Sequence, residues 1–469
     1  MKVKIINIKT LLLIGGIMML FLNKAIANGE EYFGKANALM EQGKYQEAIE
    51  TYDMAIKQNP ELGVAYYNKG TALIELERYQ EAMDAYDLAI KYKPDAYGAY
   101  YNKGLILQIQ GRDQEAIESF NMVIKQDPNF TGAYTSKGIS LDKVGRHQEA
   151  LDAYDLAIKY NPVEYKTYYN KGIALDKLGR HQEAIDAYDL AIKFNPVEYN
   201  DAYYNKGIAL DKLGRYREAI EAYDMAIKYK PDFSDAYYDK GDALCRLAEY
   251  QKAVDAYDLA IKYKPDNAEA HRNKGMILAY LGRYQEAIDA YDMAIKYKPN
   301  DAKVHHKRGA VLESLERYQE AVDAYDMVIK QNPNIIDAYN DKGIALDKLG
   351  RQQESIDAYD LAIKYKPDEF NAYYNKGIAL DKLGRYQEAI DAYDMAMKYK
   401  PDHPHLYNNI GVVLDKQGRH QEAIDAYELA IKYKPDFSKA YLNQSISLVK
   451  LGRIKEADEA FVKAKLLSK

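Results

Sequence analysis

Apolar residues recur along most of this chain at the spacing of amphipathic helices. In the stretch 63–96, Tyr66 and Gly70 are four residues apart and Leu73 follows three later. That spacing places the three positions on one face of a helix. After a polar break the same spacing resumes over residues 82–90. The stretch therefore predicts two amphipathic helices joined by a short turn.

Proline closes the second helical pattern at a regular interval, because proline cannot continue a helix. The prolines are Pro60, Pro94, Pro128, Pro162, Pro196, Pro231, Pro265, Pro299, Pro333, Pro367, Pro401 and Pro435. Each step is 34 residues except one of 35, from Pro196 to Pro231. One residue is thus inserted in a loop before a helix, where it does least harm. We predict a continuous array over residues 28–469. Its thirteen repeats are 29–62, 63–96, 97–130, 131–164, 165–198, 200–233, 234–267, 268–301, 302–335, 336–369, 370–403, 404–437 and 438–469.

Glycine recurs at two places in the repeat. Gly70 and its equivalents lie in the middle of the first helix, where glycine costs ~1 kcal/mol relative to alanine. Its missing side chain therefore predicts a close approach of two helices. Most repeats also carry glycine between the helices, as at Gly384, where a left-handed residue closes a helix. Glu77, Ala248 and Glu316 occupy this place in three repeats, which predicts less regular turns there.

Oppositely charged residues four apart recur on the second helix. Asp87 is followed by Lys91, and Asp394 by Lys398. Residues at this spacing are neighbours on a helix surface. We therefore predict an ion pair within each of these helices.

The 34-residue period, with its aromatic, Gly, Ala, aromatic, Ala and Pro landmarks, resembles the tetratricopeptide repeat family across residues 29–469. Tyr stands in place of the usual Trp, as at Tyr66, and His271 and His305 substitute twice. The resemblance implies an all-α fold, a right-handed superhelical solenoid of about thirteen helix-turn-helix units. Each unit contacts only its neighbours, and the family binds partners on the inner wall.

The repeat 438–469 departs from the pattern. It has Ser445 in place of Gly and carries Gln444, Ser447 and Lys450 on its first helix. Stacked arrays need a polar terminal unit. These residues therefore predict an end-capping repeat.

Residues 1–27 have a different composition from the array. Three lysines precede the apolar run 11–22, and the small residues Ala25 and Ala27 follow. This order is typical of a secretory signal peptide. We expect export across a bacterial-type inner membrane, to the periplasm or outside the cell, and a mature chain that begins at Asn28 and is not in the membrane. The alternative is an uncleaved inner-membrane anchor with the repeats outside the cytoplasm, but a span needs about 20 apolar residues.

Charge and cysteine content narrow the function classes. The formal charge of −6 becomes −10 without the four lysines of residues 1–27, and such an acidic chain is a poor partner for nucleic acid or an anionic membrane. Cys245 is the single cysteine, so no disulfide forms within the chain. Contact with another chain through Cys245 is the alternative to an inert thiol.

Catalytic chemistry is not indicated, because a catalytic centre needs different groups that converge on one point. The chain instead repeats one Asp-Lys pair along the array. The copies are Asp142 with Lys143, Asp176 with Lys177, Asp211 with Lys212, Asp347 with Lys348, Asp381 with Lys382 and Asp415 with Lys416. We expect no enzyme and no cofactor.

Histidines give the only candidates for a metal site. His271, His305 and His306 could approach one another, but no carboxylate or cysteine has matching spacing. His147, His181 and His420 occupy a position that is Tyr in several repeats. We therefore expect polar variants of Tyr and no metal.

One face of each first helix carries Tyr, then apolar residues, then acids. These positions lie one, five and eight residues past the leading aromatic, and so share a face; we call it the inner face. Its Tyr, with neighbouring Asn, could hold an extended peptide. Tyr that only packs between repeats, or stacks on sugar rings, is the alternative. The candidate groove is Tyr67, Tyr101, Asn102, Tyr169, Asn170, Tyr204, Asn205, Tyr238, Tyr374 and Asn375.

A basic patch interrupts the acidic array where its repetition breaks down. The candidate anion site is Arg272, Asn273, Lys303, His306 and Lys307. Lys303 and Lys307 are four apart on one helical face. In tetratricopeptide domains that bind the carboxylate end of chaperone tails, basic residues occupy the positions of Lys303 and Lys307. An asparagine occupies the position of Asn273 in those domains. Tyr238 and Asp242 stand where that clamp has Lys and Asn, and Asp242 would repel a carboxylate unless the basic groups outweigh it.

These observations favour a non-catalytic, exported scaffold that binds a peptide or protein in the inner groove. The alternative is a protein that binds a glycan or cell-wall polymer through the same Tyr and Asn residues.

Overall fold

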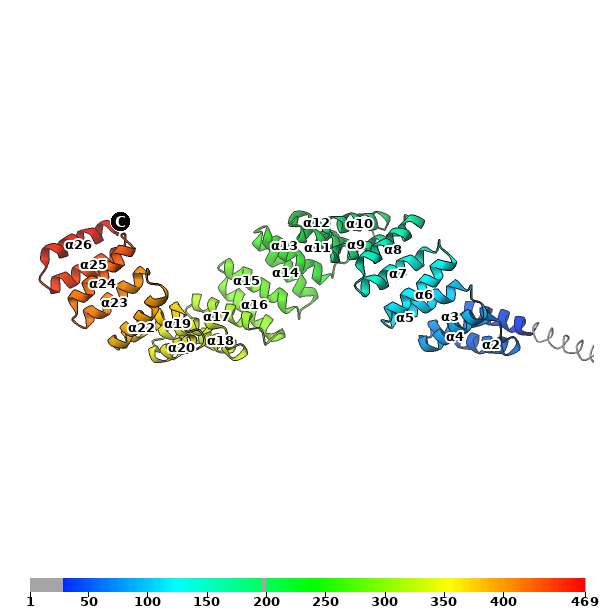
Figure 1. Ribbon diagram of the computed structural model, residues 1–469, viewed down its shortest axis with the longest axis horizontal. Helices are drawn as coiled ribbons and strands as arrows, with labels where there is room; N and C mark the ends of the chain where they lie inside the picture. Colours follow the sequence, from blue (N-terminus) through cyan, green and yellow to red (C-terminus); the bar gives the residue numbers. More distant parts are fainter. Residues whose placement is uncertain (1–27, 196–199, 469) are drawn as a thin grey trace, which may run out of the picture. The chain divides into compact units, whose positions relative to one another are not determined.

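The computed structural model describes residues 28–195 and 200–468, and within them it contains helices and turns but no strand. The helices form two compact blocks, which meet in sequence between Asp232 and Phe233 (Figure 1). The fold-class prediction, an all-α solenoid of stacked helix pairs, is confirmed. The signal prediction falls on residues 1–27, outside the described residues.

The N-terminal block pairs its helices in chain order, and each pair packs on the next (Figure 1). It begins with a helix at residues 28–41. The following helices are α2 (Tyr45–Gln58), α3 (Gly63–Glu75), α4 (Tyr79–Tyr92), α5 (Tyr97–Ile109), α6 (Asp113–Gln126), α7 (Thr131–Lys143), α8 (His147–Tyr160), α9 (Tyr165–Lys177), α10 (His181–Phe194), α11 (Asn200–Lys212) and α12 (Tyr216–Tyr229).

The C-terminal block repeats this arrangement. Its helices are α13 (Ser234–Arg246), α14 (Tyr250–Tyr263), α15 (Ala268–Tyr280), α16 (Tyr284–Tyr297), α17 (Ala302–Ser314), α18 (Tyr318–Gln331), α19 (Ile336–Lys348), α20 (Gln352–Tyr365), α21 (Phe370–Lys382), α22 (Tyr386–Tyr399), α23 (Pro404–Lys416), α24 (His420–Tyr433), α25 (Ser438–Lys450) and α26 (Ile454–Leu467). In the described part of the chain, no helix has the length and apolar character that a membrane span requires.

Each helix pair before α25 and α26 closes around one buried aromatic ring. Tyr393 of α22 is 1% exposed and lies against Gly377 of α21. A Cβ at Gly377 would stand 2.4 Å from Cε1 of this ring, inside any real contact distance. The predicted close approach at the mid-helix glycine is confirmed, and the ring itself fills the space of the missing side chain.

The turns between paired helices keep one geometry whether or not they contain glycine. Glu77, Ala248 and Glu316 have φ of 57°, 59° and 58°, in the same left-handed region as Gly384 at 73°. At the first of these turns the backbone N–H of Arg78 donates to the carbonyl oxygen of Leu73 at 2.9 Å, as in the glycine turns. The prediction of less regular turns is wrong, because the two helices fix the turn and the side chain must adopt it.

We expect Glu77→Gly, Ala248→Gly and Glu316→Gly each to raise the free energy of unfolding. An L-residue in the left-handed region costs about 1 kcal/mol that glycine does not. Urea denaturation followed by circular dichroism measures the change. Gly384→Ala serves as the reverse control and should lower stability by a similar amount. An unchanged midpoint in all four variants would mean that these turns carry no backbone strain.

The predicted ion pairs within the second helix are wrong. Asp87 pairs with Lys103 of the following repeat, while the ammonium of Lys91 lies 5.2 Å from the ring centroid of Tyr92. Lys398 contacts the sulfur of Met395. The helix of the following repeat brings a lysine to the carboxylate of Asp87, so this pair joins two repeats rather than one helical turn.

The prediction that Gln444, Ser447 and Lys450 form a polar cap at residues 438–469 is also wrong. The side chain of Ser447 is fully buried, and Lys450 pairs with Asp415 of the preceding repeat. Gln444 is half-buried. These polar groups contact the array behind them, and several exposed side chains of α25 and α26 are apolar.

Candidate functional site

The groove tyrosines lie half-buried on first helices of both blocks. Each packs on the buried ring of its own repeat. The ring centroids are 5.8 Å apart for Tyr67 and Tyr86 and 6.2 Å apart for Tyr374 and Tyr393. Tyr67 also lines a pocket of about 290 Å³ at the N-terminal ends of α3 and α5.

Asparagine side chains connect these tyrosines to the next repeat. Asn205 donates to the hydroxyl of Tyr169 at 3.0 Å, and Asn273 donates to that of Tyr238 at 3.1 Å. Burial raises the pKa of Tyr169 and raises that of Tyr238 to about 12, so both hydroxyls stay protonated. The Tyr and Asn residues thus stabilise the stacking of repeats and leave only part of each ring exposed.

Other groove asparagines bond within the array as well. Asn102 donates to the hydroxyl of Tyr86 at 3.1 Å, and Asn170 to the carbonyl oxygen of Lys166 at 2.9 Å. Tyr101 lies with its ring centroid 4.9 Å from that of Phe130. The amides of Asn102, Asn170 and Asn205 are therefore hydrogen-bonded within the array. A ligand in the candidate groove would mainly contact the exposed parts of the tyrosine rings.

A ladder of ion pairs runs beside the tyrosines. The acid at the end of one first helix binds the lysine of the next repeat. The pairs are Asp142 with Lys177, Asp176 with Lys212, Asp347 with Lys382, Asp381 with Lys416 and Asp415 with Lys450. The repeated Asp-Lys motif is therefore a connection between repeats, and its carboxylates are already neutralised.

Histidine reinforces three steps of this ladder. His147, His181 and His420 contact Asp142, Asp176 and Asp415 through Nδ1. Burial by itself would raise the pKa of Asp415, but bonds from Lys450, His420 and Ser447 outweigh it and lower that pKa. Asp415 is thus held as a carboxylate.

The ladder is interrupted over three consecutive repeats, from α13 to α17. Cys245 and Ala279 stand at two of the acid positions, and Glu313 at the third accepts a hydrogen bond from Tyr325 at 2.7 Å. Tyr280 replaces a ladder lysine and is 70% exposed, with its ring 4.7 Å from that of Tyr250. Sequence reasoning missed this surface; the Tyr at a lysine position was the signal for it.

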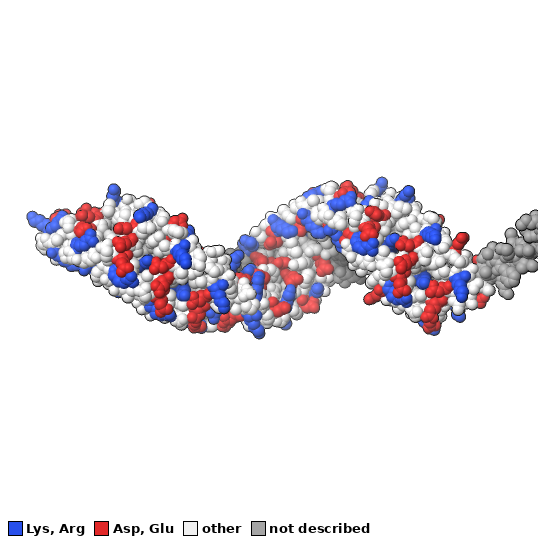
Figure 2. Space-filling view, turned by 60° about the horizontal axis from the view of Figure 1, so that its bottom comes forward, with Lys and Arg blue, Asp and Glu red and all other residues white. Residues whose placement is uncertain are grey.

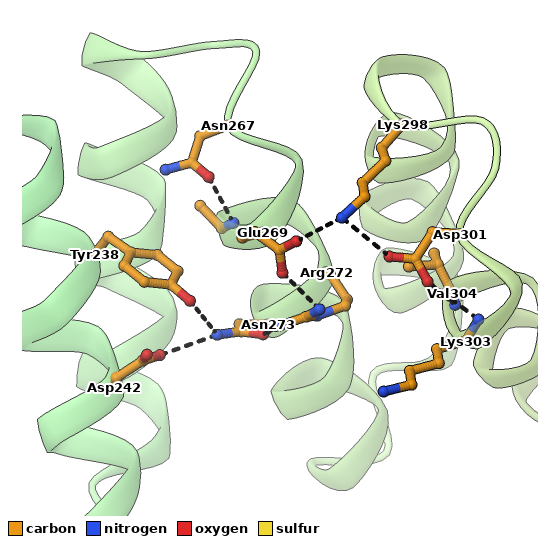
Figure 3. Close-up of polar contacts among 11 residues, drawn as sticks. Tyr238, Asp242, Asn267, Glu269, Arg272, Asn273, Lys298, Asp301, Lys303 and Val304 are labelled. Atoms are coloured by element: carbon orange, nitrogen blue, oxygen red, sulfur yellow. Dashed lines mark hydrogen bonds and ion pairs between the residues drawn. The ribbon is translucent and has the colours of Figure 1, made fainter.

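The candidate anion site lies in the same gap (Figure 3). Arg272 is paired with Glu269 at 2.5 Å, and Lys298 also reaches Glu269, at 3.2 Å. Asn273 accepts from Arg272 and donates to Asp242 at 3.0 Å. Arg272 and Asn273 are therefore held by groups of the protein itself.

Lys303 and Lys307 are the exposed cations of the site. Neither ammonium has a hydrogen bond or ion pair to any residue that the structure describes. His306, between them in sequence, contacts Asp341 at 2.9 Å. In Figure 3 the side chain of Lys303 points away from Asp301 and Lys298. Of the five candidate residues, the two lysines are those with charge to offer a ligand.

The other histidines and the cysteine are held by packing. His271 and His305 each bond the carbonyl oxygen of a proline, Pro265 and Pro299, at 3.0 Å, as Tyr168 does with Pro162 in another repeat. Within the described ranges no group of three His, Cys, Asp or Glu side chains could hold a metal ion.

The thiol of Cys245 is half-buried and lies 3.5 Å from the hydroxyl of Tyr257. Burial raises the pKa of this thiol, so the reactive thiolate is disfavoured at neutral pH.

Surface charge shows no broad basic area on the face seen in Figure 2. Acidic side chains form short rows there, with basic side chains beside them. Such a mixed surface lacks the extended positive field that nucleic-acid binding uses.

A model of the tetratricopeptide repeat matches residues 33–91, 67–129, 135–198, 204–268, 306–372, 340–404 and 374–438, and a second model of that description matches 268–301. No curated protein matches the chain.

Similar solved structures cover a part of the chain. A crystal structure of MamA protein is 29% identical, covers 38% of this chain and 96% of its own, and has a TM-score of 0.35. A structure of YrrB, described as a TPR protein with an unusual peptide-binding site, is 24% identical over 40% of this chain and 97% of its own, with a TM-score of 0.37. A structure of MamA from Desulfovibrio magneticus RS-1, from residue 41 to its end, is 24% identical. It covers 36% of this chain and 94% of its own, with a TM-score of 0.34.

Proposed function

Because this chain belongs to the tetratricopeptide repeat family, we propose that it is an exported, non-catalytic scaffold that binds a peptide or protein segment on its inner face. The family's use of this surface supports the proposal. The repeated Asp-Lys motif supports the non-catalytic part of the proposal, because its carboxylates form ion pairs with lysines of the next repeat. Export rests on the signal-like composition of residues 1–27.

The ligand site is the gap in the ladder, from α13 to α17. The single observation that carries it is the coincidence of this gap with two exposed cations, Lys303 and Lys307, that have no ion pair within the described chain. The contacting helix α15 adds an exposed apolar pair, Met276 and Tyr280. A segment with carboxylates for the lysines and an apolar side chain for this pair fits the surface.

We expect Lys303→Ala with Lys307→Ala to weaken binding of a glutamate-rich peptide that carries leucines by about tenfold, since two charge contacts are lost. Binding to the unaltered protein should also weaken as salt rises. Fluorescence anisotropy with the labelled peptide measures both effects. Circular dichroism should show unchanged helicity, because both side chains are exposed.

A matched control removes one lysine from the second helix of the repeat that contains Lys303 and Lys307 and one from the second helix of the preceding repeat. Lys296→Ala with Lys330→Ala changes the net charge equally and lies on the second helices α16 and α18. It should leave binding unchanged. Equal loss in both double variants would reduce the effect to net charge, and no loss in either would return the search to the tyrosine surface.

Capture from the native cell tests the scaffold itself. Co-purification followed by mass spectrometry should identify bound polypeptides. Retention of purified cell-wall glycan with no polypeptide captured would instead support the alternative of a glycan-binding protein.

Export gives a separate expected result. Native protein should begin at Asn28, because the small residues Ala25 and Ala27 suit a cleavage site that ends at residue 27. Intact-mass measurement decides this. A chain that keeps Met1 and sediments with membranes would show the anchored form.

A further inference from the structure

The end face of the C-terminal block exposes large apolar side chains. It is formed by α25 and α26 (Figure 1), and its apolar residues are between 41 and 63% exposed. Patches of this kind on a soluble protein mark interaction sites. The residues are Leu442, Ile446, Ile454, Phe461, Val462 and Leu466.

Phe461 is the central residue of this face. In the preceding repeats the aromatic ring at its position is buried, as Tyr427 is at 2% exposure, whereas Phe461 is 51% exposed. Leu442 stands at the position whose tyrosines contact that ring in other repeats, as Tyr374 contacts Tyr393. Phe461 and Leu442 therefore form one apolar surface across α25 and α26.

This face is not built to receive another repeat. Ile424, one repeat earlier, packs against Leu448 and Ala457 of the repeat that follows it. Its equivalent in α26 is Asp458, and the equivalent of Ile431 is Lys465. A further helix pair stacked here would bury the carboxylate of Asp458 at a place where Ile424 is 1% exposed, and a buried charge without a partner costs several kcal/mol.

The same two charges suit an antiparallel contact between two copies of α26. Asp458, Phe461 and Lys465 are three and four residues apart, so they lie on one stripe of the helix. Within residues 28–195 and 200–468 neither charge has an ion pair or hydrogen bond. A two-fold axis that passes between Phe461 and Val462 places residue 458 of each copy opposite residue 465 of the other.

We propose that the end face binds the end face of a second copy of this chain, as a symmetric dimer. Phe461 and Val462 pack at the axis, with Leu442 and Ile446 beside them. Two equivalent ion pairs, Asp458 to Lys465 of the other copy and the reverse, flank this centre and fix the antiparallel register. Lys303 and Lys307 take no part in this contact, so each copy keeps its own ligand site.

Sedimentation equilibrium of the full chain tests the dimer. We expect a monomer–dimer equilibrium for the unaltered protein. Asp458→Lys alone, or Lys465→Asp alone, places like charges opposite each other and should raise the dissociation constant at least about tenfold. The double exchange Asp458→Lys with Lys465→Asp should restore dimerisation. An equimolar mixture of the two single variants should form mixed dimers, because all four facing charges are then complementary.

Glu459→Lys is the matched control. It makes the same charge change on the next residue of α26, off the stripe of Phe461, and should leave the dissociation constant unchanged. A monomer at all concentrations, assemblies larger than dimers, or a dimer indifferent to both single exchanges would each overturn the proposal. Circular dichroism of every variant separates loss of pairing from loss of folding.

Discussion

Deletion of residues 370–403 is expected to leave a folded, helical protein. The deletion removes α21 and α22 together and joins Glu369 to Pro404, the first residue of α23. After the deletion, α23 packs on α20 instead of α22. Tyr359 and Ala362 of α20 then take the places of Tyr393 and Ala396 of α22, which are the same residue types. Nearest-neighbour stacking makes stability nearly additive over repeats, so the melting temperature should fall only modestly.

Deletion of α21 alone, residues 370–385, should instead abolish cooperative unfolding of the C-terminal block. It leaves Tyr393 without Gly377 and exposes the apolar face of α22, and each buried side chain of this size contributes about 2 kcal/mol. Thermal unfolding by circular dichroism and by calorimetry compares the two deletions. Equal tolerance of both would contradict the repeat boundaries at residues 370 and 403.

Gly377→Ala should destabilise the protein, although alanine favours an ordinary helix by ~1 kcal/mol. The new Cβ would lie 2.4 Å from Cε1 of Tyr393, and the fully packed ring has no space to move away. Overpacking of this kind costs about 1–3 kcal/mol. Chemical denaturation measures the loss.

Gly34→Ala provides the matched control, because a Cβ at this helical glycine meets nothing within 4 Å. It should raise stability by ~1 kcal/mol. Tyr393→Leu combined with Gly377→Ala should cost less than the sum of the two single changes, since the ring that clashes is gone. Stabilisation by Gly377→Ala would show that ring and helix separate easily.

The helical pattern of the sequence was enough to predict the helix pairs and the close contact at the mid-helix glycine. The helix pairs and the glycine contact both depend on side chains that lie on one face of a helix within a single repeat. The period of 34 residues shows to which repeat each side chain belongs. The left-handed turns at Glu77, Ala248 and Glu316 were not predicted, because residue preference there is overridden by the two helices that the turn must join.

The candidate site was predicted in part. The sequence located the basic residues at Arg272, Lys303 and Lys307 by their departure from the repeat. It could not tell that Glu269 pairs with Arg272 while the two lysines keep no partner in the described chain. Such pairing depends on which side chains neighbouring helices bring within reach, and a list of residue types does not contain those distances.

The sequence by itself determined the all-α class, the helix pairs and the acidic character of this protein, because periodicity and composition are properties of the chain alone. The tertiary structure alone decided the partners of its charges. Asp87 binds Lys103 rather than Lys91, and Asp142 binds Lys177 of the next repeat. The physical reason is that ion pairs and exposed faces form between repeats, where stacking sets which atoms meet. The apolar end at Phe461 is the clearest case, because only the fold shows that nothing in the described chain covers it.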